Sequence, residues 1–193
     1  MRMLLVVVGA LWLSAAPLYA ADIGVEGKKL VIQDTLAHAG DAQVVFVSRY
    51  HAPVAKGSGT DVSAIDAQFE IAYVNGLTSG SFVMPSGGNW LVNIARIAKY
   101  VNKPAPLGGG VRVGLIKPDG KLKLTGKSLG DSPIDILGAG DPGPSGVLTV
   151  FTVNNGGETN RHCTLFVGCV YALISQGTGA QLTCRNGTAA ACP

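Results

Sequence analysis

Residues 111–131 (VRVGLIKPDGKLKLTGKSLGD) contain the pattern that most constrains the fold of this chain. Apolar residues recur at every second position on both sides of the tripeptide PDG at 118–120, which is typical of half-buried strands. Proline presets the backbone for the second position of a tight turn, and glycine readily takes the position that closes it. The stretch therefore predicts a β-hairpin, with these side chains on its buried face: Val111, Val113, Leu115, Leu122 and Leu124.

Short strands are also predicted over most of the remaining chain. The clearest lies at 68–75, where Phe69, Ile71 and Tyr73 alternate with polar or small residues. Others are expected at 29–33, 43–49, 81–84, 147–153, 170–175 and 180–184. Residues 90–100 fit a helical face or a strand, and their strand-rich neighbours favour a strand; 61–66 could form one helical turn, and 134–137 a brief strand.

Many short strands separated by turn residues indicate an all-β protein. The 27 glycines and 10 prolines supply Gly/Pro-rich loops. We therefore expect a single antiparallel β-sandwich, Ig-like or jelly-roll-like, rather than an α/β enzyme.

The first 20 residues have the features of a secretory signal peptide. Arg2 is followed by an apolar run and then by small residues up to Ala20 and Ala21. The alternative is a membrane anchor, but the run falls short of the roughly 20 apolar residues that span a bilayer. We expect cleavage after Ala20, or else after Ala21, which leaves residues 21–193 as one domain outside the cytoplasm, either secreted or periplasmic.

The charge balance excludes some partners. Without Arg2, 14 basic residues stand against 12 acidic ones, a formal charge of +2. That balance is too weak to imply nucleic acid, and no later segment is apolar for long enough to span a membrane. A surface polysaccharide or another surface protein remains as an expected partner.

Four cysteines lie near the end of the chain, at Cys163, Cys169, Cys184 and Cys192. An even number in an exported chain predicts two disulfides. The short loops favour Cys163–Cys169 with Cys184–Cys192; the competing pairing is Cys169–Cys184 with Cys163–Cys192. Zinc ligation is the other use of such residues, but their spacing does not fit it.

Catalytic and metal-binding motifs are weak. Gly126-Lys127-Ser128-Leu129-Gly130 matches the G-x-S-x-G pattern, and His162 follows it, but no strand-to-helix turn is predicted there. His38, His51 and His162 lie in separate segments without metal-ligand spacing. Asp131, Asp135 and Asp141 share a Gly/Pro-rich region, but not with the spacing of an EF-hand. We expect no cofactor and no metal site.

A cluster of lysines is the candidate patch for an anionic ligand. Lys117, Lys121, Lys123 and Lys127 lie on the outer side of the 111–131 hairpin, with Lys99 and Lys103 expected nearby. Such a face can contact an anionic polysaccharide or lipid headgroups. The plainer interpretation is that the lysines protect a strand edge from unwanted pairing.

Four segments resemble a pattern that recurs in a family of small exported bacterial all-β proteins with no known activity. They are KGSGTDVSAIDAQFEIAY (56–73), AKYVNKPAP (98–106), GKLKLTGKSLGD (120–131) and TNRHCTLFVGC (159–169). The resemblance implies export, a β-rich fold and paired cysteines. It implies no catalytic or binding residue.

Together these observations favour a secreted or surface-exposed, non-enzymatic protein with a binding, adhesive or structural role. Two alternatives belong to other classes. One is a secreted hydrolase that uses Ser128 and His162. The other is a subunit of a surface appendage, assembled by strand addition at an open sheet edge.

Overall fold

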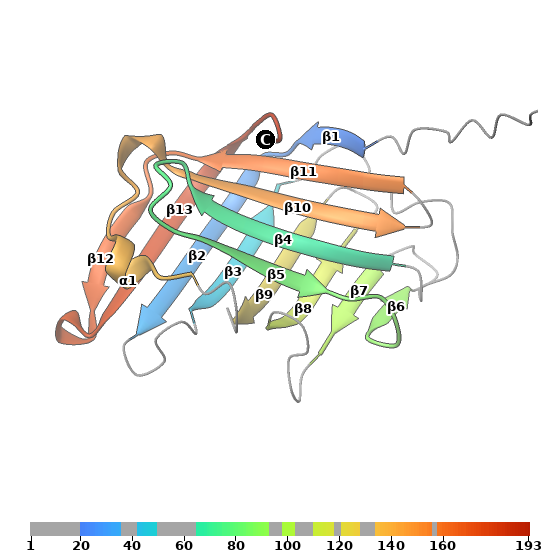
Figure 1. The fold of residues 1–193 in the computed structure, drawn as a ribbon, viewed down its shortest axis with the longest axis horizontal. Coiled ribbons are helices and arrows are strands. Elements are labelled where there is room, and N and C mark those ends of the chain that lie inside the picture. Colours follow the sequence, from blue (N-terminus) through green and yellow to red (C-terminus); the bar gives the residue numbers. More distant parts are fainter. Residues whose placement is uncertain are drawn as a thin grey trace, which may run out of the picture.

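The computed structural model describes residues 20–35, 42–49, 65–92, 98–102, 110–117, 121–127, 134–155 and 158–193. Within these ranges the chain is almost entirely β-structure (Figure 1). The strands are β1 (Ala20–Gly24), β2 (Gly27–Thr35), β3 (Gln43–Ser48), β4 (Ile65–Tyr73), β5 (Ser79–Met84), β6 (Trp90–Val92), β7 (Ala98–Val101), β8 (Val111–Ile116), β9 (Leu122–Lys127), β10 (Val147–Asn155), β11 (Glu158–Phe166), β12 (Val170–Ile174) and β13 (Gly179–Ala189). A short α-helix, α1 (Ile136–Ala139), and a 3-10 turn, η3 (Gly143–Ser145), lie between β9 and β10, and a second 3-10 turn, η4 (Ser175–Gly177), lies between β12 and β13. No helix in the described ranges is long and apolar enough to cross a membrane.

All strands belong to one 13-stranded sheet with the order β5-β4-β10-β11-β13-β2-β3-β9-β8-β7-β6. Strand β12 pairs with β13, and β1 pairs with β11 in the sheet's parallel contact. The sheet curls, so that β5, β4, β10 and β11 cross over the remaining strands (Figure 1). We call β5, β4, β10, β11 and β1 the small layer, and the strands from β12 and β13 to β6 the large layer. The two layers join where β11 pairs briefly with β13, through Thr164↔Ala189 and Leu165↔Thr188.

The hydrophobic core lies between the layers. Phe46 of β3 in the large layer contacts Phe69 of β4 in the small layer, with ring centroids 4.8 Å apart. Phe69 also lies within 6.2 Å of Phe82 and 6.0 Å of Phe151, measured between centroids. These rings come from four different strands. Their burial therefore holds the crossed layers together.

The all-β prediction is confirmed, whereas a β-sandwich is not, because the layers belong to one continuous curled sheet. The strand at 68–75 is confirmed as part of β4, with Phe69, Ile71 and Tyr73 buried. The strand preference at 90–100 is confirmed for 90–92 and 98–100, which pair as β6 and β7, while residues 93–97 lie outside the described residues. Residues 61–64 of the expected helical turn lie outside the described residues, and Ile65 already belongs to β4.

The hairpin predicted at 111–131 is present as β8 and β9, but its buried face in β8 was predicted wrongly. The pairing register shifts between Val111 and Val113. Consequently Val111 faces the core, and after the irregularity Gly114 and Ile116 do so in place of Val113 and Leu115. The turn residues at 118–120 lie outside the described residues.

The expected pairing at 134–137 is also wrong, because this segment enters helix α1. Asp135 caps the helix: its Oδ1 accepts a hydrogen bond of 2.6 Å from the backbone N–H of Gly138. This is the usual role of aspartate at a helix N-terminus. The side chain of Ile136 is buried beneath it.

The disulfide pairing favoured by loop length is wrong as well. The bonds are Cys163–Cys192 and Cys169–Cys184. The first holds the last residues against β11, and the second joins the start of β12 to β13. Both bonds thus link segments that the sheet brings together.

Candidate functional site

The large layer carries a row of basic side chains on its outer face. Residues that lie opposite one another in neighbouring strands project from the same face of a sheet. The register places Arg185 of β13 opposite Lys29 of β2, and Lys29 opposite Val47 of β3. The same line then runs through Lys123, Leu115, Lys99 and Leu91 on β9, β8, β7 and β6.

This row faces away from the core. Leu30, Phe46 and Leu124, which adjoin it along their strands, are buried between the layers. Side chains alternate between the two faces of a strand, and Lys29, Lys99, Lys123 and Arg185 are accordingly exposed. Because neighbouring strands lie about 4.8 Å apart, lysines two strands apart are separated by roughly 10 Å. The result is a line of cations in which Arg185 and Lys29 lie on adjacent strands, while Val47 and Leu115 separate Lys29, Lys123 and Lys99.

A hollow of about 360 Å³ lies beside the row, next to Lys29, Val47 and Lys123. Its lining residues are Glu26, Lys28, Ser48, Arg49 and Lys121. Lys28 directly precedes Lys29, and Lys121 lies two residues before Lys123, so the hollow extends the same positive region. We call the row, the lysines and arginine of this hollow, and Lys117 the basic face.

Three polar contacts shape this hollow. The backbone N–H of Leu122 donates a hydrogen bond of 2.7 Å to the buried hydroxyl of Ser48, which ties the end of β3 to β9. Arg49 donates to the side-chain oxygen of Asn186 and lies 3.8 Å from the carboxylate of Glu26. Three cations thus share the hollow with a single carboxylate. Its electrostatic character is positive.

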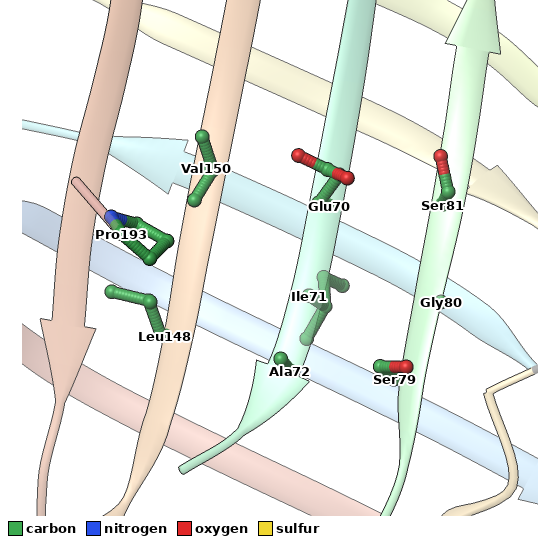
Figure 2. A pocket seen from close by; sticks show the side chains of 9 residues that line it. All are labelled: Glu70, Ile71, Ala72, Ser79, Gly80, Ser81, Leu148, Val150 and Pro193. Carbon is green, nitrogen blue, oxygen red and sulfur yellow. The ribbon is translucent and has the colours of Figure 1, made fainter. Parts of the chain in front are cut away.

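A second hollow, of about 320 Å³, lies on the outer face of the small layer (Figure 2). Leu148 and Val150 of β10 form part of its floor beside Pro193, while Glu70, Ser79 and Ser81 supply polar groups from β4 and β5. The amide nitrogen of Gln68 donates to the carboxylate of Glu70 at 3.2 Å and to the hydroxyl of Ser81 at 2.8 Å. Among the described residues that line this hollow there is no histidine, cysteine or lysine, and Glu70 is the ionisable side chain beside its serines.

Arg161 holds the chain ends together near this second hollow. Its guanidinium forms two hydrogen bonds of 2.7 Å with the carboxylate of Asp22 in β1 and donates a third, also of 2.7 Å, to the backbone oxygen of Pro193. The hydrogen bonds from Arg161 lower the pKa of Asp22, and the same contact raises the pKa of Arg161. These groups are already engaged with each other. Their role is to fasten β1 and the tail to β11.

The structure places part of the predicted lysine patch within the basic face. Lys123 is a member of the row, while Lys117 and Lys121 lie at the adjoining ends of β8 and β9, where the N–H of Lys117 donates to the carbonyl of Lys121. Lys127 belongs to β9, and its side chain is not described. Lys99 joins the row as expected, whereas Lys103 lies outside the described residues.

Lys28, Lys29, Arg49 and Arg185 were not among the predicted site residues. Lys29 is the first residue of the strand predicted at 29–33, so its outward direction could have been inferred from the alternation. Nothing local, however, shows that β2 lies between β13 and β3. These cations could be grouped only once the order of the strands in the sheet was known.

The structure does not test the candidate hydrolase pair Ser128 and His162, because Ser128 lies outside the described residues. His162 lies opposite Phe151 on the core-facing side of the small layer and is only 3% exposed. Ser128, His38, His51 and Asp131 lie outside the described residues. Asp141, like Asp135, accepts a backbone hydrogen bond, in this case from Gly143 at 2.8 Å.

Within the described ranges, no group of three or more His, Cys, Asp or Glu residues could hold a metal ion. Comparison with family models, curated proteins and solved structures found no match to this chain. The basic face is therefore interpreted from its own geometry and charge.

Proposed function

We propose that this protein is an exported, non-enzymatic binding protein that attaches to an anionic polysaccharide through its basic face. The observation that carries the proposal is the cross-strand row of Arg185, Lys29, Lys123 and Lys99. A line of exposed cations across neighbouring strands can meet the repeated negative groups of an extended polymer. The apolar side chains between the cations offer contact to the polymer's sugar rings.

The distribution of charge over the two layers supports binding through the large layer. Asp66 and Glu70 project from the outer face of the small layer, opposite Asn154 and Val150 of β10. Negative groups therefore occupy the surface turned away from the basic face. A protein with this asymmetry would approach a polyanion with the large layer first.

Export is the second part of the proposal. Residues 1–20 would be removed as a signal peptide, which leaves Ala21 at the start of β1. Two disulfides fit an extracellular or periplasmic location, since such bonds persist in oxidising compartments. Intact mass of the secreted chain tests this part: it should lack residues 1–20 and fall short of the reduced mass by two hydrogens for each disulfide.

A binding experiment tests the first part. The mature chain should bind immobilised dextran sulfate or polygalacturonate and should not bind neutral dextran. The double substitution Lys29→Gln with Lys123→Gln should weaken binding about tenfold, because two exposed charge contacts at about 0.7 kcal/mol each amount to that factor.

A matched control separates the row from net charge. Ser79→Glu with Val83→Glu changes the net charge by the same amount, but on the outer face of the small layer. This variant should bind almost as well as the unaltered chain. Equal losses in both variants, or no binding to either polyanion, would overturn the proposal.

The hydrolase alternative receives less support. A serine hydrolase needs a histidine that can reach both its nucleophile and substrate, and His162 faces the core. Activity that survives Ser128→Ala or His162→Gln would exclude that pair as the catalytic residues.

A further inference from the structure

Strand β12 stands at an open edge of the large layer. One of its edges pairs with β13 along its whole length, from Val170↔Thr183 to Ile174↔Gly179. No other described strand pairs with its second edge, and Figure 1 shows β12 at the outer side of the layer. The Cys169–Cys184 disulfide holds the start of this strand in place. The free edge is therefore a rigid row of backbone hydrogen-bonding groups.

Both faces of β12 expose apolar side chains. Val170, on the same face as the basic row, is 66% exposed, and Leu173, on the opposite face, is 61% exposed. Val167, just before the strand, is 49% exposed. A strand that is apolar on both faces is typical of the interior of a sheet, where neighbours cover it. Strand β12 therefore has the composition of a central strand, although it lies at an edge of the sheet.

The usual protection of an open edge is missing from this segment. Natural proteins place lysine, proline or inward-pointing charges on such edges to prevent pairing with other chains. Residues 163–184 contain no charged residue and no proline. By contrast, the strands β2, β9 and β7 of the same layer each expose lysine on the outer face.

We propose that two copies of this chain pair through β12, antiparallel, about a two-fold axis at Ala172. The strand VYALI is complementary to itself in this arrangement. Val170 would lie opposite Ile174 of the second copy, Tyr171 opposite Leu173, and the small Ala172 opposite its own equivalent. Aromatic–aliphatic and aliphatic pairs of this kind stabilise neighbouring strands. No like charges meet, because the strand has none.

Its chemistry favours a second copy over other occupants. An anionic polymer would find no cation on VYALI and only one polar group, the hydroxyl of Tyr171, so the ligand proposed for the basic face does not suit this edge. Pairing of β12 with another edge strand among the described ones, β5 or β6, would be head-to-tail and would build rings or open chains of molecules. Pairing of β12 with itself closes after two copies.

This pairing also has a consequence that rests on the proposed function. Antiparallel neighbours keep their faces on the same side of a sheet, so both basic faces would point in one direction. The dimer would then bind a polyanion through two basic faces, which raises avidity without any new kind of contact. The dimer itself can be tested without any ligand.

The first test is the molar mass of the mature chain over a range of protein concentrations, by sedimentation or light scattering. The unaltered chain should be a dimer. Ala172→Lys, at an exposed position, should yield monomers because two lysines would face each other at the axis. Val83→Lys, an equal change at an exposed position of β5, should remain dimeric. Unchanged circular dichroism would show that both variants fold.

Cross-linking tests the geometry. All four native cysteines are paired, so Ala172→Cys introduces the single free thiol. Opposed residues in antiparallel strands have Cα atoms about 4.5–5.5 Å apart, within the range of a disulfide. Mild oxidation should therefore convert Ala172→Cys, but not Val83→Cys, to a covalent dimer. A monomeric unaltered chain, a dimeric Ala172→Lys variant, or preferential cross-linking of Val83→Cys would overturn the proposal.

Discussion

Lys29 of β2 and Lys123 of β9 project from the same face of the large layer, with Val47 of β3 between them. They are distant in sequence and become neighbours only through the strand order. Arg185 and Lys99 continue the line on either side. The basic face is thus a property of the sheet rather than of any single hairpin.

Binding to a polyanion should depend on salt in proportion to the cations engaged. Counterions released from the polymer make the logarithm of affinity fall linearly with the logarithm of salt concentration. Lys29→Gln and Lys123→Gln should each reduce that slope by roughly one. Titrations of dextran sulfate at several salt concentrations measure this slope. An unchanged slope in both variants would mean that neither lysine touches the polymer.

Gly146→Ala should be far more damaging than Gly143→Ala. Both glycines have positive φ, +77° and +68°, a conformation that costs other residues about 1–2 kcal/mol. A Cβ at Gly146 would lie 2.0 Å from the backbone oxygen of Phe166, whereas at Gly143 it meets nothing within 4 Å. We expect the free energy of unfolding to fall by about 3 kcal/mol or more in Gly146→Ala and by about 1 kcal/mol in Gly143→Ala. Denaturant unfolding of the two variants gives the comparison, and equal losses would show that the clash is relieved.

Peptide mapping under non-reducing conditions should recover Cys163 linked to Cys192 and Cys169 linked to Cys184. Replacing either pair by alanine should lower the free energy of unfolding by about 3–4 kcal/mol, since the enclosed segments span 29 and 15 residues. Loss of Cys163–Cys192 should also free the tail that holds Pro193 at the small-layer hollow. Recovery of Cys163 linked to Cys169 would contradict the structure.

Asp34 should make the protein less stable as the pH rises. Its side chain is buried, and burial raises its pKa above the usual 3.8. The folded chain therefore holds this proton more tightly than the unfolded chain. The resulting stability is complete below the usual pKa and is lost as the pH rises through the raised value. Asp34→Asn should abolish this loss, as shown by unfolding measurements across that pH range.

Asp22 provides a control of opposite sign. Arg161 lowers the pKa of Asp22, so its contribution is present above the usual pKa and is lost as the pH falls through the lowered one. Asp22→Asn should therefore weaken the protein at neutral pH and matter less in acid. Parallel pH profiles for Asp34→Asn and Asp22→Asn would contradict both assignments.

Local patterns in the sequence determined much of the secondary structure. Alternating apolar residues located β4 and β9, because a strand with one covered face must repeat every two residues. The same rule failed in β8, where the irregularity between Val111 and Val113 reverses the faces of the residues that follow. It failed again at α1, where the cap formed by Asp135 starts a short helix.

The sequence by itself determined the all-β class, most strands and the presence of four cysteines suited to pairing. Only the tertiary structure decided which cysteines pair, how one curled sheet covers its own core, and which cations share a face. The reason is physical. Side-chain alternation depends on neighbours along the chain, whereas strand order and register depend on contacts between distant segments, such as Phe46 with Phe69 and β13 with β2.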